Sequence, residues 1–279
     1  MSEPRVGHIH FLNVLPLSWG FSHGMGKGLA LTRGVPAELN RDIVSHRLDV
    51  SPVSSIIYAQ HSEELYLLPD FCISSDGAVQ SILLISKKPI EALKDDKIIL
   101  TAKSATSHCL LKIILRRGYG AAPSYSIRSI APDEPVPKDA TASLFIGDDA
   151  LWLYHHPPAS LYCYDLGAEW KTLTGKKMVY AVWVATKAFA TESPVLLQLV
   201  YDRIRHAFAK GIANKDAAIA SVLAETPFTR RQLADYLGSV IRWELTDDFL
   251  DGLHTFYALA REMGLIDCVP PLKMAAVRK

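Results

Sequence analysis

The chain has 279 residues, of which 49% are hydrophobic and 21% are charged, and its 30 basic and 29 acidic side chains leave a formal net charge of +1. This is the composition of an ordinary globular protein, and the length is sufficient for two lobes. The basic residues are scattered along the sequence and form no stripe, which argues against a nucleic-acid-binding protein. No apolar stretch approaches the length of a membrane span, so we also expect no membrane partner.

The N-terminus and the cysteines indicate where the protein works. The first eight residues contain neither a long apolar run nor a small-residue cleavage site, so we expect a cytoplasmic protein without a signal peptide. The four cysteines form no CxxC pair and have apolar or aromatic neighbours. That pattern predicts free, buried thiols rather than a disulfide framework.

Short apolar runs alternate with helical patterns over the first two thirds of the chain. The predicted strands are 6–12, 29–32, 65–68, 79–86, 97–101, 144–146, 161–165 and 179–185, with helices predicted at 106–117 and 166–174. This alternation predicts an α/β fold with mostly parallel sheets. Beyond residue 193 the pattern becomes helical, with predicted helices at 194–213, 215–225, 229–237 and 246–263.

The stretch from Arg33 to Ser55 predicts a turn, a helix, a short strand end and a second helix start. Gly34 and Pro36 end the preceding strand and open the first helix, while Ser54 and Ser55 stand where the second helix begins. Strand ends and helix starts that converge in this way form clefts for small anionic ligands.

Two long apolar strands, 79–86 and 178–185, are predicted to cross between lobes. We therefore expect residues 1–85 and 186–279 to form one lobe with a helical C-terminal tail, and residues 86–185 to form an inserted second lobe. Two such crossings imply a cleft that can close.

Polar residues at predicted strand ends and helix starts are the candidates for ligand binding. Asn13 follows the first strand, where its amide could bind a ligand or cap a helix. Ser104, Thr106 and Ser107 precede an apolar helix, where they could hold a carboxylate or act only as caps. Asp148 follows a buried strand and could face the cleft or cap the next helix.

No motif for a metal or a nucleotide cofactor is present. His8 and His10 alternate on one strand, but no third ligand stands at a familiar spacing. The sequence contains no GxGxxG, Walker A or GxSxG motif. We therefore expect no metal and no organic cofactor.

A set of segments with a distinctive order and spacing runs through the first two thirds of the chain. They are Arg5–Leu17 with its FLNVLPL run, Gly34–Asn40, Leu48–Ser55, Pro69–Asp70, Ser75–Gly77, Ser104–Ser107, Ile146–Asp148, Asp165–Gly175 and Ala181–Trp183. Together these segments resemble the chorismate dehydratase family of the futalosine route to menaquinone. Departures from the family pattern occur at Ile57, at Ala78 after the Asp-Gly pair, and at Lys177–Met178 before the return strand.

The resemblance implies a type II periplasmic-binding-protein-like fold and a cytoplasmic enzyme that dehydrates chorismate to 3-[(1-carboxyvinyl)oxy]benzoate without a cofactor. It implies that Asn13 is catalytic. The substrate-binding residues that it implies are Ser55, Ser81, Ser104, Thr106, Ser107 and Asp148.

The reaction needs a base, and asparagine, serine and threonine are not bases near neutral pH. We therefore hypothesise that the enolpyruvyl carboxylate of chorismate removes the ring proton itself. Two alternatives remain open: a non-enzymatic solute-binding protein for a carboxylated aromatic ligand, and the related dihydroxynaphthoate synthase. A larger cleft with a histidine pointing into it would favour the synthase. The sequence does not indicate an oligomeric state.

Overall fold

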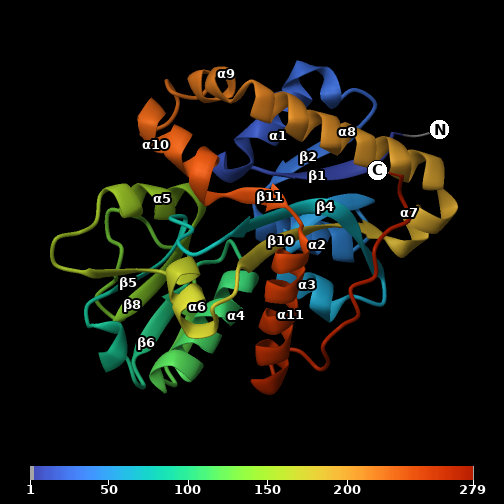
Figure 1. Ribbon diagram of the computed structural model, residues 1–279. Coiled ribbons are helices and arrows are strands. Elements are labelled where there is room, and N and C mark those ends of the chain that lie inside the picture. Colours follow the sequence, from blue (N-terminus) through green and yellow to red (C-terminus); the bar gives the residue numbers. More distant parts are fainter. Residues whose placement is uncertain (1–2, 279) are drawn as a thin grey trace.

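Two β-sheets lie beside one another, each with helices packed on it, in a computed structural model that describes residues 3–278 (Figure 1). The first sheet has the order β11-β4-β10-β3-β1-β2, and the second has the order β7-β6-β8-β5-β9. The strands of the first sheet are β1 (Arg5–Ile9), β2 (Ala30–Gly34), β3 (Val50–Ser54), β4 (Leu65–Ser75), β10 (Met178–Thr186) and β11 (Arg242–Glu244). Those of the second are β5 (Ile82–Ser86), β6 (Lys97–Leu100), β7 (Ser124–Ile127), β8 (Ala142–Ile146) and β9 (Tyr162–Asp165).

The expectation of mostly parallel sheets is wrong, because both sheets are mixed. In the first sheet β1 pairs in parallel with β2 and β3, but β10 returns between β3 and β4 and is antiparallel to both. In the second sheet β6 is parallel to β7 and β8, whereas β5 is antiparallel to β8 and β9. A chain that leaves one sheet and later returns to it produces these antiparallel neighbours.

The helices cover the sheets and form the C-terminal tail. They are α1 (Leu15–Gly20), α2 (Pro36–Val44), α3 (Ser55–Gln60), α4 (Thr106–Ile113), α5 (Gly147–His155), α6 (Leu166–Thr174), α7 (Lys187–Glu192), α8 (Pro194–Ala213), α9 (Lys215–Ala220), α10 (Arg230–Asp235) and α11 (Asp247–Glu262). Short 3₁₀ turns occur at η1 (Leu12–Val14) and η3 (Ile90–Ala92), and π-helical turns at η2 (Phe21–Met25), η4 (Ile114–Gly118) and η5 (Tyr236–Val240).

Local sequence explains several of these boundaries. Pro36 opens α2, where Glu38 accepts a hydrogen bond from the Val35 backbone N–H at 3.1 Å. A capping box at Thr229 opens α10. Helix α8 packs closely on α1 because Gly211 lacks a side chain: a Cβ there would lie 1.8 Å from the carbonyl oxygen of Pro16.

The two long apolar strands do not cross between the sheets as predicted. β5 pairs only with strands of the second sheet, and β10 only with strands of the first. The chain instead passes between the sheets at residues 76–81 and, after α6, at residues 175–177. The lobe boundaries at residues 85 and 185 stay a prediction, and the sheet assignments favour moving them to these two connections.

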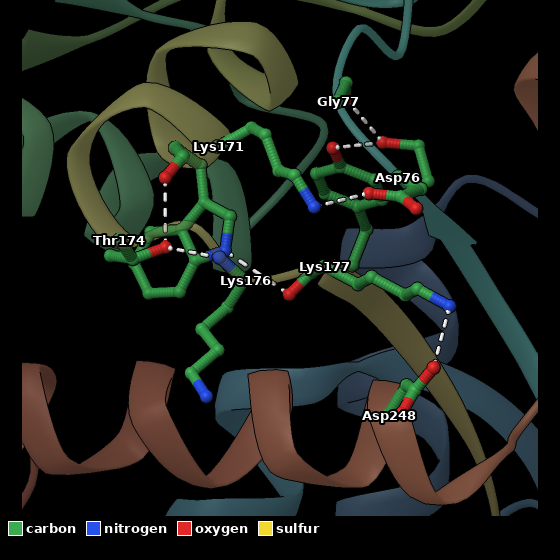
Figure 2. Close-up of polar contacts among 10 residues, drawn as sticks. Asp76, Gly77, Lys171, Thr174, Lys176, Lys177 and Asp248 are labelled. Carbon is green, nitrogen blue, oxygen red and sulfur yellow. Dashed lines mark hydrogen bonds and ion pairs between the residues drawn. The ribbon is translucent and has the colours of Figure 1, made fainter.

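Ion pairs hold both connections in place (Figure 2). Lys171 on α6 binds Asp76 in the first connection at 2.7 Å, and Lys177 in the second binds Asp248 on α11 at 3.0 Å. The Lys177 carbonyl also accepts a hydrogen bond from the Trp170 indole at 3.1 Å. The unusual lysine at position 177 therefore attaches the second connection to the helical tail.

The cysteine side chains decide one further expectation. The four thiols are free, but Cys163 and Cys268 are exposed, so the expectation that all four are buried is wrong. Cys163 lies on β9, an edge strand, and Cys268 lies in the segment after α11, outside any helix or strand. Within residues 3–278, no helix combines the length and apolarity needed to cross a membrane.

Candidate active site

A narrow cavity of about 50 Å³ lies between the two sheets. It is lined by Ile9, Phe11, Asn13, Pro36, Ser54, Ile73, Val79, Ser81, Ile82, Ser104, Ser107, Ile146, Gly147, Tyr180, Ala181 and Ile241. These residues come from the ends of strands in both sheets and from the starts of helices that follow them. None of them carries a charged or imidazole side chain.

Asn13 is the most informative residue of the cavity. It lies on the η1 turn after β1, and its carbonyl oxygen accepts a hydrogen bond from the Trp243 indole N–H at 2.8 Å. Its side-chain oxygen Oδ1 is buried and has no hydrogen-bond partner among residues 3–278. A buried amide oxygen is costly to leave unpaired, so this atom is suited to a hydrogen-bond donor on a ligand.

Ser104 and Ser107 form a hydroxyl pair at the start of α4. The Ser107 hydroxyl donates to that of Ser104 at 2.6 Å, and both residues line the cavity. The backbone N–H groups of a helix start and these hydroxyls can bind a carboxylate without a formal positive charge.

Ser81 lines the cavity from the first connection between the sheets. Its hydroxyl accepts a hydrogen bond from the Tyr236 hydroxyl at 2.8 Å and donates to the Val79 carbonyl at 3.3 Å. Gln80, which precedes it, has a positive φ of 61°, while the backbone N–H groups of Val79 and Gln80 donate to the Asp165 carboxylate. Asp165 therefore holds a strained segment in place beside the cavity.

Ser55 and Thr106 lie behind the cavity wall and are absent from its lining. Both are fully buried, and their hydroxyl oxygens are 3.2 Å apart. Ser55 donates to the Val179 carbonyl at 2.9 Å, and Thr106 accepts from the Ile56 backbone N–H at 3.3 Å. These contacts connect α3, α4 and β10, so the two hydroxyls support the cavity from outside.

Asp148 faces a neighbouring cavity that shares Ile9 and Phe11 with the first. Its Oδ1 accepts a hydrogen bond from the Leu12 backbone N–H at 3.1 Å. Burial raises the pKa of this carboxyl to about 6, although the Leu12 N–H acts in the opposite direction. Of the seven predicted residues, four therefore line the first cavity and two lie behind its wall, while Asp148 lies beside it. The four are Asn13, Ser81, Ser104 and Ser107, and the two are Ser55 and Thr106.

Two polar residues of the cavity were missed in the sequence. Ser54 lines it instead of Ser55, and Asn40 holds Ser54 through two hydrogen bonds at 2.9 and 3.0 Å. Tyr180 lines it from β10, and its hydroxyl lies 2.8 Å from the Ser75 hydroxyl. The sequence signal for Tyr180 was a hydroxyl within a largely apolar strand.

No group of three or more His, Cys, Asp or Glu side chains in the described part of the chain is arranged to hold a metal ion. His8 is buried and lies 3.1 Å from the Ser18 hydroxyl. Burial, followed by the charges of Arg33 and His10, lowers the pKa of His8 to about 4. His8 therefore lies beside the neighbouring cavity as a neutral imidazole.

The fold and the cavity define a periplasmic-binding-protein-like protein with two α/β lobes. One solved structure with this fold, a protein from Archaeoglobus fulgidus, is 18% identical with a TM-score of 0.77, over 94% of this chain and 98% of that one. Another, the alkanesulfonate-binding protein SsuA from Xanthomonas axonopodis pv. citri, bound to MOPS, is 14% identical with a TM-score of 0.72, over 100% and 98%.

Sequence comparison identifies the family within this class. A menaquinone biosynthesis family profile matches residues 4–262, and the chain belongs to that family. A chorismate dehydratase from Thermus thermophilus is 34% identical over 224 residues, which cover 75% of this chain and 78% of the relative. The family resemblance predicted from the ordered segments is therefore confirmed.

Proposed function

We propose that this protein dehydrates chorismate to 3-[(1-carboxyvinyl)oxy]benzoate as a step of menaquinone biosynthesis. The observation that carries the proposal is an uncharged cavity into which Asn13 presents an unpaired amide oxygen. The family membership and the Thermus relative support the same reaction. Turnover of chorismate by the purified protein tests it.

The reaction removes the C4 hydroxyl and the C3 proton of the ring. The C3–H bond breaks, its electron pair forms a new ring double bond, the C4–O bond breaks, and water leaves. The ring becomes aromatic, which makes the overall step strongly favourable. The protein then has to orient the substrate, exclude water and assist the departing hydroxyl.

Asn13 is the group suited to the departing hydroxyl. Its unpaired Oδ1 would accept the hydrogen bond of the C4 hydroxyl in the bound substrate. Its amide N–H would donate to the same oxygen as negative charge develops there. A donor in a water-poor cavity stabilises such charge more strongly than one in water.

The two substrate carboxylates would be held by neutral donors. Ser104 and Ser107 at the start of α4 are our candidates for one carboxylate, and Ser54 and Ser81, which also line the cavity, are our candidates for the other. Ser55 and Thr106 would support these groups from behind, and Asp148 from the neighbouring cavity.

The base is proposed to be the enolpyruvyl carboxylate of chorismate itself. No residue lining the cavity between positions 3 and 278 has a carboxylate, imidazole or amine. The ether oxygen at C3 keeps the enolpyruvyl carboxylate close to the C3 proton, so an intramolecular transfer benefits from a high effective concentration. We propose no cofactor and no metal for this step, and a cytoplasmic location for the enzyme.

Other results of this test would indicate one of two other functions. One alternative is a non-enzymatic solute-binding role, because the fold of this chain is similar to that of the binding protein SsuA and one fold can serve both enzymes and binding proteins. Recovery of unmodified chorismate from the protein would favour that role. A dihydroxynaphthoate synthase is disfavoured because no histidine in the described chain lines the cavity.

A further inference from the structure

Asp148 contacts the segment that carries Asn13 rather than the cavity itself. Leu12, whose N–H donates to Asp148, directly precedes Asn13 in the η1 turn. On the other side of Asn13, the Trp243 indole donates to its carbonyl. The backbone around Asn13 is thus fixed by one hydrogen bond from each lobe: Asp148 follows β8 in the second sheet, and Trp243 lies on β11 in the first.

The start of α5 is shaped to bring Asp148 close to this turn. Gly147 has a positive φ of 67°, and a Cβ at that position would lie 2.9 Å from the Phe11 ring. The Gly147 N–H donates to the Ser81 carbonyl at 2.9 Å, which fixes the helix start against the cavity. Only glycine allows Phe11 and the start of α5 to approach so closely.

We infer that Asp148 is a positioning residue that holds Asn13 in its catalytic orientation by accepting the Leu12 hydrogen bond. This inference rests on the proposed function and assigns Asp148 no contact with the reacting atoms. Because a carboxamide oxygen accepts the same hydrogen bond as a carboxylate oxygen, the charge of Asp148 is dispensable for this role. A general base, in contrast, cannot be replaced by asparagine.

Two substitutions separate these roles. Asp148→Asn keeps an acceptor for Leu12 and is expected to retain most of the wild-type kcat. Asp148→Ala removes the acceptor and is expected to lower kcat by roughly tenfold to a hundredfold, with little change in KM. The matched control is Asp149→Ala, the next residue of α5, whose carboxylate binds Lys103 at 2.5 Å and which is expected to stay near the wild-type rate.

A double-mutant cycle tests whether Asp148 acts through Asn13. If it does, adding Asp148→Ala to Asn13→Ala lowers kcat by no more than about twofold further. Independent roles would instead multiply the two effects. The reaction product has lost the C4 hydroxyl, so titration calorimetry with 3-[(1-carboxyvinyl)oxy]benzoate is expected to give nearly unchanged affinity in each variant.

A measurement that does not require turnover tests this inference independently of the proposed reaction. Amide hydrogen exchange at Leu12 is expected to be slow in the wild type and in Asp148→Asn, and fast in Asp148→Ala, whether or not chorismate is a substrate. Fast exchange in the wild type would overturn the contact. An Asp148→Asn variant as inactive as Asp148→Ala, or multiplicative effects in the cycle, would overturn the positioning role.

Discussion

The Leu12 backbone N–H and the Asp148 carboxylate are joined by a hydrogen bond of 3.1 Å that connects the two lobes beside the cavity. A second such connection joins the Ala37 N–H to the Lys103 carbonyl at 3.2 Å. Behind the cavity, Ser55 and Thr106 form a third. These hydrogen bonds connect the two lobes around the cavity in the arrangement that the structure describes.

Replacing Asn13 with alanine should slow the reaction and leave the fold intact. The variant loses a hydrogen bond to an oxygen that gains charge, an effect of about 1.5–3 kcal/mol, or roughly tenfold to a hundredfold in kcat. Steady-state kinetics together with a thermal melt check this. Asn214→Ala, at the exposed end of α8, is the matched control. Full activity in Asn13→Ala would show that Asn13 has only a structural role.

A substrate analogue tests the proposed base. If the enolpyruvyl carboxylate of chorismate is converted to an uncharged amide, the analogue should bind but not react, since an amide cannot accept the C3 proton near neutral pH. Binding is measured by calorimetry and turnover by the appearance of an aromatic product. Efficient dehydration of the amide analogue would rule out the substrate-assisted mechanism.

His8 and Asp148 should give opposite pH dependences of stability. The pKa of His8 is lowered to about 4, so the unfolded chain binds the proton more readily, and stability is lost as the pH falls from about 6.5 to about 4. The pKa of Asp148 is raised to about 6, so the folded chain holds the proton more readily, and stability is lost as the pH rises from about 4 to about 6.

Each of the two groups changes the free energy of unfolding by up to about 3 kcal/mol over its pH range. Because the two changes have opposite signs, they nearly cancel in the wild type. Urea unfolding between pH 3.5 and 8 checks this. Relative to the wild type, Asp148→Asn should gain stability as the pH rises, and His8→Gln should gain stability as it falls. Parallel profiles for all three proteins would show that neither group titrates differently on folding.

Thr106 should matter more for stability than for chemistry. Thr106→Val leaves the Ile56 N–H buried without an acceptor, which should destabilise the fold by about 1–3 kcal/mol. The activity of the folded variant should stay near that of the wild type. Denaturant unfolding and kcat are compared with those of Thr255→Val on α11, whose hydroxyl bonds an exposed carbonyl. Lost activity with unchanged stability would instead place Thr106 in substrate binding.

Local patterns predicted most helices of the fold, but not how its strands pair. The bounds of α6 and α8 agree with the predicted ranges, because each helix has an apolar face and clear end signals. β11 was missed because its three residues, within a helical tail, carry too little periodicity to detect. The mixed strand order was also missed, since it depends on where β10 inserts between distant strands.

Candidate site residues were found where a polar group follows a strand or starts a helix, as with Asn13 and Ser104. The same signal could not distinguish Ser54 from Ser55, because adjacent residues at a strand end point in different directions. Local sequence patterns also could not show that Asp148 faces Leu12. The two residues are 136 positions apart in the sequence, and their contact forms only when the two lobes meet.

The most direct test of the account is incubation of the purified protein with chorismate after exhaustive treatment with a chelator. Mass spectrometry should detect 3-[(1-carboxyvinyl)oxy]benzoate forming at an undiminished rate, with Asn13→Ala far slower. Recovery of unchanged chorismate would contradict the proposed reaction, and activity restored only by one added metal would contradict the cofactor-free mechanism.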